Sequence, residues 1–320
     1  MNATRIESGS RLHFGLLGWG PELSRQFGGV GLMIEKPGLV IIAQNASDWQ
    51  ARGPLAHRCL QIALDVSEKL QACGTVVAPL AFEIEQIPGE HTGLGVGTQL
   101  SLAVARLITH QTGMATLSAT ELAQLTGRGL RSGIGLHGFD RGGLIVDGGH
   151  GQNQGPPPLI TALSFPADWN ILVVTPELER GRHGSEERSA FATMPAVPRA
   201  THERLCRLLI TGILPAVVET DLGTFGAALQ EFQQEVGSTF ASAQGGTFAH
   251  PKLAEVAQAM SRVGLQGVGQ SSWGPTLYGF TNRTPEDLTA FTQELQERFK
   301  LQHHELLWTR AQQRPTLVEN

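Results

Sequence analysis

The stretch that decides the fold is Gly93-Leu94-Gly95-Val96-Gly97-Thr98, which runs directly into Gln99-Leu100-Ser101-Leu102-Ala103. It follows an alternating run, Leu80 to Ile87, that is typical of a half-buried strand, and it opens a helix of small residues. Glycines at this spacing let backbone N–H groups point inward, and the start of a helix adds positive potential. The pattern therefore predicts a phosphate-binding turn, although a glycine-rich turn alone is weak evidence because tight turns need glycine anyway.

Outward from this turn, the chain alternates short apolar runs with segments of helical spacing. Its 320 residues, 41% hydrophobic and 17% charged, have ordinary globular composition and enough length for two domains. We expect strands at 11–17, 39–43, 80–87, 171–174, 267–272, 276–281 and 303–311, and helices at 55–73, 99–110, 119–128, 203–218, 222–236, 252–263 and 285–299. The second half thus predicts an α+β sandwich. Gly148 to Pro158 is typical of an exposed connector, and we place the domain boundary near residue 165.

Composition also excludes several classes of function. The net charge of −5 gives no electrostatic footprint for nucleic acid or an anionic membrane. The three cysteines (Cys59, Cys73 and Cys206) are far apart, which argues against a disulfide framework or structural zinc and favours a reducing compartment. No apolar run is long enough to span a bilayer, and the first residues lack a signal core. We therefore expect a cytoplasmic protein that binds neither nucleic acid nor membrane.

Two more glycine-rich segments accompany the first one. Ser132-Gly133-Ile134-Gly135 lies about forty residues further on, and Gly267-Val268-Gly269-Gln270-Ser271-Ser272-Trp273-Gly274-Pro275 lies in the second half. Three such segments in this order resemble the GHMP small-molecule kinases over nearly the whole chain. The resemblance implies an α+β, GHMP kinase-like fold: a mixed N-terminal α/β domain over residues 1–165 and a ferredoxin-like α/β-sandwich domain over residues 166–320.

The chain departs from those kinases where their chemistry resides. Their first motif reads Gly-Leu-Gly-Ser-Ser, whereas Val96 and Gly97 stand here in place of the two hydroxyl residues. Their second motif commonly carries an aspartate at the position of Gly135. Their third motif is a run of small residues, here replaced by the bulkier Ser271 to Pro275. Losing the carboxylate and both hydroxyls argues against phosphoryl transfer, which depends on positioning and on charge stabilisation by such groups.

One branch of the superfamily has these same substitutions, the β-ribofuranosylaminobenzene 5′-phosphate synthases. The resemblance rests on five blocks in order: Arg11 to Leu17, Phe27 to Pro37, Gly93 to Leu100, Arg131 to Gly149, and Ser271 to Pro275. It implies a pentosyltransferase that couples 5-phosphoribosyl 1-pyrophosphate to 4-aminobenzoate. The reaction releases carbon dioxide and pyrophosphate and leads toward tetrahydromethanopterin-type one-carbon carriers. The sequence leaves 4-hydroxybenzoate open as the acceptor. We also expect a homodimer.

This chemistry needs cations, a divalent metal and amide donors around a departing pyrophosphate. The residues expected to take part in catalysis are Arg11, His13, Arg131 and Asp140. Those expected to bind substrate are Lys36, Gly93, Gly95, Gly97, Thr98, Gln99, Ser132, Gly133, Ser271, Ser272 and Trp273. We expect Mg²⁺ as cofactor, with Glu35 and Asp140 as alternatives for its principal carboxylate. Asp147 is a further acid of the blocks, but it could equally organise the turn after its strand.

A polar loop, Pro176 to Glu187, is a candidate lid over the phosphates, and Trp273 is a candidate shield against water. Two other functions remain open. One is an ATP-dependent small-molecule kinase with an unusual site, and the other is a kinase-like protein that binds a ligand without turnover. The sequence holds no type I phosphoribosyltransferase loop of two adjacent acids before a Thr-rich turn. Binding of the ribosyl donor is therefore inferred from the resemblance alone.

Overall fold

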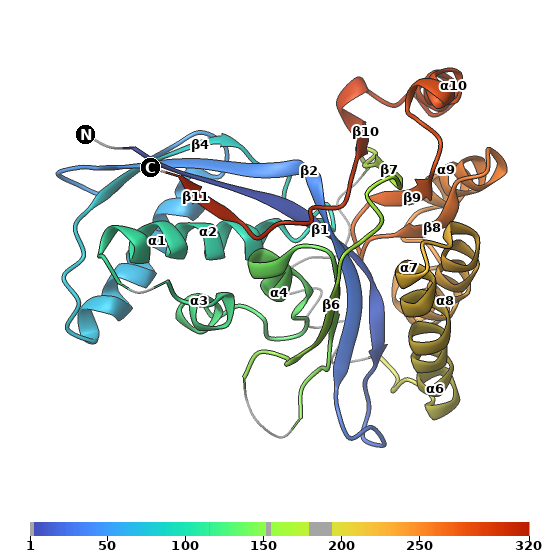
Figure 1. The fold of residues 1–320 in the computed structure, drawn as a ribbon, viewed down its shortest axis with the longest axis horizontal. Coiled ribbons are helices and arrows are strands. Elements are labelled where there is room, and N and C mark those ends of the chain that lie inside the picture. The colour runs from blue at the N-terminus through green and yellow to red at the C-terminus, as the bar shows by residue number, and fades with distance from the viewer. Residues whose placement is uncertain (1–2, 115, 152–154, 179–193, 320) are drawn as a thin grey trace.

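The structure is a computed structural model that describes residues 3–114, 116–151, 155–178 and 194–319. Two antiparallel strands, β1 (Thr4–Gly18) and β2 (Phe27–Asn45), form the spine of the first half (Figure 1). They belong to a seven-stranded sheet with the order β11-β1-β2-β4-β3, to which β5 and β6 are attached through β2. The other strands are β3 (Gln50–Arg52), β4 (Leu80–Gln86), β5 (Leu144–Asp147), β6 (Leu159–Leu163) and β11 (Leu317–Glu319).

The helices of the first half lie beneath this sheet (Figure 1). They are α1 (Ala56–Ala72), α2 (Val96–Gln111), α3 (Ala119–Thr126) and α4 (Ile134–Arg141). Helix α2 is buried on nearly every side, including its small residues Ser101, Ala103 and Ala105. Because these side chains are short, α1, α3, α4 and the sheet can all pack closely against it. The first turn of α2 is thereby fixed at the junction of the two halves.

The second half is built on a four-stranded sheet. Its strands are β7 (Asn170–Val174), β8 (Gln266–Gln270), β9 (Leu277–Thr281) and β10 (Leu306–Thr309), in the order β10-β7-β9-β8. Every neighbouring pair is antiparallel. This order and direction are those of a ferredoxin-like sandwich, which confirms the predicted fold class. The helices are α6 (Arg199–Leu208), α7 (Leu214–Val218), α8 (Leu222–Gln244), α9 (Pro251–Arg262) and α10 (Thr289–Phe299).

Four features differ from the sequence-based expectation. A π-helical turn, Leu209–Ile213, interrupts the helix expected over 203–218, and α8 continues to Gln244 rather than ending near residue 236. Helix α4 forms within a segment that reads only as glycine-rich. Its Gly138 is needed for packing, since a Cβ there would lie 2.4 Å from Met33 Cγ. Finally, β11 returns to pair with β1, so the end of the chain completes the first sheet.

One hydrophobic cluster joins the two halves. Phe14 of β1 contacts Tyr278 and Phe280 of β9, with ring centroids 5.2 Å and 6.1 Å apart. Phe225 of α8 lies 5.1 Å from Phe280 in a T-shaped arrangement. This shared core holds α8 against β1 and so sets the space between them. No helix among the described residues is long and apolar enough to cross a bilayer.

Candidate active site

The candidate site is a cavity of about 730 Å³ between the two halves. Its walls come from β1, the first turn of α2, the segment 127–135, helices α8 and α9, and residues 270–273. Each of the three glycine-rich segments noted in the sequence therefore contributes to it. A volume of this size is typical of a pocket for small molecules.

One part of the cavity is cationic. Arg11, Arg128 and Arg131 line it, next to Thr98 in the first turn of α2. Arg128 is held by a hydrogen bond from its Nε to Ser101 Oγ (3.0 Å), and burial together with nearby Arg58 lowers its pKa. Among the described residues that line the cavity, none is Asp or Glu. Three guanidinium groups lining one cavity make this part of it suited to phosphate or pyrophosphate.

The glycine turn, residues 93–98, supports this part of the cavity, but its glycines do not line it. Arg11 crosses the turn, with its backbone N–H donating to Leu94 O (3.0 Å) and Nη1 donating to Gly93 O. A Cβ on Gly95 would lie 2.7 Å from Arg11 Cγ, and one on Gly93 would lie 2.2 Å from Ser271 O. Thr98 lines the cavity, whereas Gly93, Gly95 and Gly97 do not. The expected open amide cradle is therefore replaced by a turn packed under an arginine, and the glycines permit that close approach.

A row of three polar side chains, His13, Ser132 and Asp147, connects the cavity lining to the interior. His13 Nε2 lies 3.2 Å from Ser132 Oγ, and Ser132 Oγ donates to Asp147 Oδ2 at 3.4 Å. Asp147 is fully buried and also accepts from the backbone N–H groups of Gly133 (2.8 Å) and Gly149 (2.9 Å). Burial raises the pKa of Asp147 to about 6. Burial, Arg11 and Arg131 lower the pKa of His13 to about 3, so its imidazole is neutral.

The part of the cavity that α8 and α9 line is uncharged. Its described lining from α8, α9 and the adjoining segments consists of apolar, aromatic, amide and hydroxyl residues. Trp273 packs edge-on against Phe240 of α8, with ring centroids 5.3 Å apart. The lining residues of this part include Gln230, Gln234, Gly237, Phe240, Phe248, Ala257, Gln258 and Val268. Such a surface suits a flat aromatic ring with a polar substituent.

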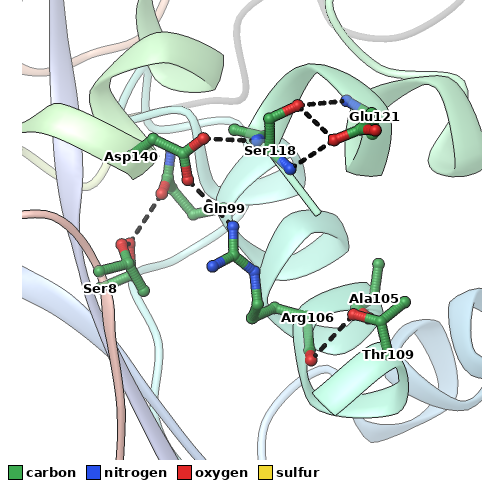
Figure 2. A network of polar contacts seen from close by, with 10 residues as sticks. Ser8, Gln99, Ala105, Arg106, Thr109, Ser118, Glu121 and Asp140 are labelled. Carbon is green, nitrogen blue, oxygen red and sulfur yellow. Dashed lines mark hydrogen bonds and ion pairs between the residues drawn. The ribbon is translucent and has the colours of Figure 1, made fainter. Parts of the chain in front are cut away.

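Ser271 and Gln99 were predicted to bind substrate, but their side chains bond to other parts of the protein. Ser271 is fully buried, donates to Gly93 O (2.7 Å) and accepts from the His13 N–H (3.0 Å). It thereby ties β1 to the glycine turn. Gln99 accepts from Ser8 Oγ (2.8 Å) and donates to Gly135 O (2.7 Å), as Figure 2 shows in part. Both ends of this amide are occupied by the protein, which leaves it a structural role.

Three further residues predicted for the site, Asp140, Glu35 and Lys36, are not part of the cavity lining. Asp140 accepts from Arg106 Nη2 (3.0 Å) and from the Ala119 N–H (2.5 Å), within the network of Figure 2. It therefore anchors α4 to α2 and α3. Glu35 and Lys36 are exposed on β2, where their backbone N–H groups donate to Arg310 O and Thr309 Oγ1. The chain brings these residues to the junction with β10, so their expected catalytic, metal or substrate contacts do not fit their positions.

These placements bear directly on the expected magnesium ion. No group of three or more His, Cys, Asp or Glu that could hold a metal occurs among the described residues. Both expected ligands, Glu35 and Asp140, are outside the cavity, and Asp147 already accepts three hydrogen bonds. The described residues of the cavity therefore do not fit a protein-held Mg²⁺. Most of the expected lid, residues 179–187, lies outside the described residues.

The structure adds residues that the sequence did not identify as part of the site. The α8 residues, from Gln230 to Gln244, read as an ordinary amphipathic helix. Only the packing of α8 over β1 reveals that this face lines a cavity.

Solved structures with similar folds include several GHMP enzymes. The homoserine kinase from Cytophaga hutchinsonii superposes with a TM-score of 0.72 at 13% identity, covering 100% of this chain and 98% of that one. The mevalonate pyrophosphate decarboxylase from Streptococcus pyogenes gives 0.69 at 12% identity, covering 99% and 98%. A family model described as GHMP kinases C terminal matches residues 213–301. At these identities the likeness establishes the fold alone, and the fold is that of the GHMP kinases.

Curated relatives are much closer in sequence. Beta-ribofuranosylphenol 5'-phosphate synthase from Archaeoglobus fulgidus is 35% identical, covering 87% of this chain and 88% of that protein. The protein of the same name from Methanothermobacter thermautotrophicus is 32% identical, covering 91% and 92%. That from Methanocaldococcus jannaschii is 28% identical, covering 87% and 89%. The chain therefore belongs to the family of the beta-ribofuranosylphenol 5'-phosphate synthases, and it is an enzyme of the synthase class.

Proposed function

We propose that the enzyme joins 5-phosphoribosyl 1-pyrophosphate to a benzoate with an electron-donating para group, forming a C-riboside with release of carbon dioxide and pyrophosphate. The observation that carries this proposal is that one cavity is lined by three arginines from β1 and the segment 127–135, and by neutral and partly aromatic side chains from α8, α9 and residues 268–273. The first suits the pyrophosphate of the ribosyl donor, and the second suits a benzene ring. The name of the relatives, with ribosylphenol as product, supports the same reaction class.

The proposed chemistry balances without a redox cofactor. Departure of pyrophosphate takes the electron pair of the C1′–O bond and leaves an oxocarbenium-like ribose. The ring carbon that bears the carboxylate then attacks C1′, because the para amino or hydroxyl group pushes electron density onto it. The bond from the ring to the carboxylate breaks next, its electron pair restores the aromatic ring, and carbon dioxide leaves.

The residues have separable roles in this scheme. Arg11, Arg128 and Arg131 stabilise charge that builds on the departing pyrophosphate. His13 is neutral, so it serves as a hydrogen-bond or proton acceptor and not as a cation for the carboxylate. Trp273 and Phe240 cover the ring and exclude water, which would otherwise capture the oxocarbenium ion.

We propose 4-aminobenzoate and 4-hydroxybenzoate as the two acceptors to compare. A ribosylphenol product, as in the relatives' name, corresponds to the hydroxy compound. The purified protein is incubated with the ribosyl donor, magnesium and each benzoate labelled in its carboxyl group. We expect label in carbon dioxide in a one-to-one ratio with pyrophosphate, and no reaction with unsubstituted benzoate. Label retained in the ribosylated product would contradict the scheme.

A second measurement separates this function from that of a kinase. Val96, Gly97 and Gly135 lack the side chains that the related kinases use for phosphoryl transfer. ATP should therefore neither be hydrolysed nor support phosphorylation of homoserine, mevalonate or galactose. Steady ATP turnover that depends on this protein would instead favour a kinase.

A further inference from the structure

We propose that Asp147 is a positioning residue that acts through Ser132 to fix the tautomer of His13 in the proposed reaction. The three residues come from separate elements, namely the end of β5, the turn before α4, and β1. They form one connected row of hydrogen bonds that ends at the cavity, where Ser132 and His13 are both part of the lining. The inference deepens the proposed function and rests on it.

The direction of each hydrogen bond follows from the carboxylate. An ionised Asp147 can only accept, and Gly133 and Gly149 each donate a backbone N–H to it. The Ser132 hydroxyl therefore donates its one proton to Asp147 Oδ2. Ser132 Oγ accepts from the Ile134 N–H at 3.3 Å, and a second lone pair faces His13 Nε2 at 3.2 Å. With its proton committed to Asp147, Ser132 must accept from His13.

This arrangement decides where the imidazole carries its proton. A neutral His13 that donates from Nε2 has an unprotonated Nδ1, which is then the ring's only acceptor. His13 is also held from its backbone, because its N–H donates to Ser271 Oγ and its carbonyl accepts from the Ser272 N–H at 3.2 Å. The backbone thus fixes the ring's location, and Asp147 fixes its hydrogen-bonding polarity.

The strongest test combines kinetics with a direct view of the tautomer. We expect Asp147→Asn and Ser132→Ala each to lower kcat by roughly 10- to 100-fold with little change in the KM of the ribosyl donor, since the arginines are untouched. The double variant should be about as impaired as the worse single variant, because both changes break one row. Independent losses that multiply would overturn the proposal.

Long-range ¹H–¹⁵N NMR of labelled enzyme reads the two ring nitrogens, with His13→Gln used to assign the signals. We expect a protonated Nε2 and a bare Nδ1 in the unaltered enzyme, and a mixed or reversed pattern in Ser132→Ala and Asp147→Asn. An unchanged pattern in both variants would overturn the proposal. This spectrum needs no substrate, so it stands apart from any failure of the proposed reaction.

The chain provides a matched control in Asp140. It too is an aspartate that accepts from a backbone N–H, but it serves α3 and α4 outside the cavity. Asp140→Asn should lower thermal stability while leaving kcat and the His13 spectrum close to those of the unaltered enzyme. If Asp147→Asn fails to fold, Ser132→Ala carries the test, because Ser132 is only partly buried. An equal loss of kcat in Asp140→Asn would indicate a general structural effect and overturn the assignment.

Discussion

At the scale of single residues, three guanidinium groups line the cavity, those of Arg11, Arg128 and Arg131. We predict that Arg131→Ala lowers kcat/KM by two to three orders of magnitude, because it removes charge that stabilises the departing pyrophosphate. Arg131→Lys should recover only part of the loss, since an ammonium lacks the bidentate fork. Arg52→Ala is the control, because Arg52 forms an exposed pair with Glu83 and is not part of the cavity lining. Equal values of kcat/KM in all three variants would mean that pyrophosphate binds elsewhere.

The buried His13 gives the fold a pH dependence of known sign. Its pKa is about 3 in the folded protein and about 6.5 when unfolded, so only the unfolded state gains a proton between these values. The contribution of neutral His13 to the free energy of unfolding is therefore fully present above pH 6.5. It declines as the pH falls, by about 2 kcal/mol at pH 5. Asp147 has the opposite effect, because its raised pKa lets the folded state take up a proton first as the pH falls. This stabilises the fold and offsets roughly 1 kcal/mol of the loss from His13 over the same pH range.

We predict that His13→Gln flattens this dependence. Urea unfolding at pH 7.5 and pH 5 should show a smaller loss of free energy in the variant than in the unaltered protein. Asp147 is present in both proteins, so the difference between them isolates His13. An identical loss in the two proteins would mean that His13 is protonated in the folded state.

Only some of the residues that the sequence suggests for the site lie at the cavity, and the reason is physical. The cavity is lined by Arg11, His13, Thr98, Arg131, Ser132, Ser272 and Trp273, because their motifs converge at the junction, and their roles stay predictions. Glu35 and Asp140 belong to the same motifs. However, the first is exposed at the β10 junction and the second pairs with Arg106. A shared motif brings backbones together, but it does not fix the direction of each side chain.

At the scale of elements, α4 shows why glycine can hide a helix. Its sequence Ile134 to Arg141 contains two glycines, which normally lower helix propensity. Burial of Ile134, Leu136 and Phe139 outweighs that cost, and Gly138 lets the helix approach β2. Periodicity alone could not reveal this, because the reason for Gly138 is a neighbour 105 positions earlier in the chain.

This packing gives a prediction about stability. Gly138→Val should cost about 1–3 kcal/mol, because its Cβ would overlap Met33 Cγ and Sδ, which lie 2.4 Å and 2.5 Å away. Met33→Ala in the same chain should recover part of the loss, whereas Gly155→Val, with no atom within 4 Å of its Cβ, should change little. Chemical unfolding of the four proteins measures these differences. A Gly138→Val protein as stable as its parent would show that β2 and α4 are further apart.

At the scale of the whole molecule, contacts between the two halves hold the walls of the cavity together. Ser272 donates its N–H to His13 O, Ser271 bridges His13 and Gly93, and the Phe14 cluster joins β1 to β9. The alternation of strands and helices predicted the α+β sandwich of the second half, and the resemblance to the GHMP kinases implied its ferredoxin-like sheet. The cavity itself was beyond sequence reasoning, since its neutral wall is the inner face of α8, whose residues carry no chemical motif.

Trp273, at the contact between the two halves, is expected to keep water out of the cavity. Trp273 lies on the segment that fastens the halves and packs on Phe240, covering the neutral part of the cavity. An oxocarbenium ion formed beside it reacts with whatever nucleophile is nearest, either the ring carbon or water. Trp273→Ala removes that cover, so we expect pyrophosphate release to exceed carbon dioxide release, whereas the unaltered enzyme keeps the two equal.

Trp273→Phe is the matched variant, because it retains an aromatic face toward Phe240 and should keep most of the coupling. Both products are measured in the same reaction, so a general loss of activity lowers both and leaves their ratio unchanged. Only a loss of shielding raises the ratio of pyrophosphate to carbon dioxide. A Trp273→Ala enzyme that is slow but still releases the two in equal amounts would show that water is excluded by other parts of the cavity wall.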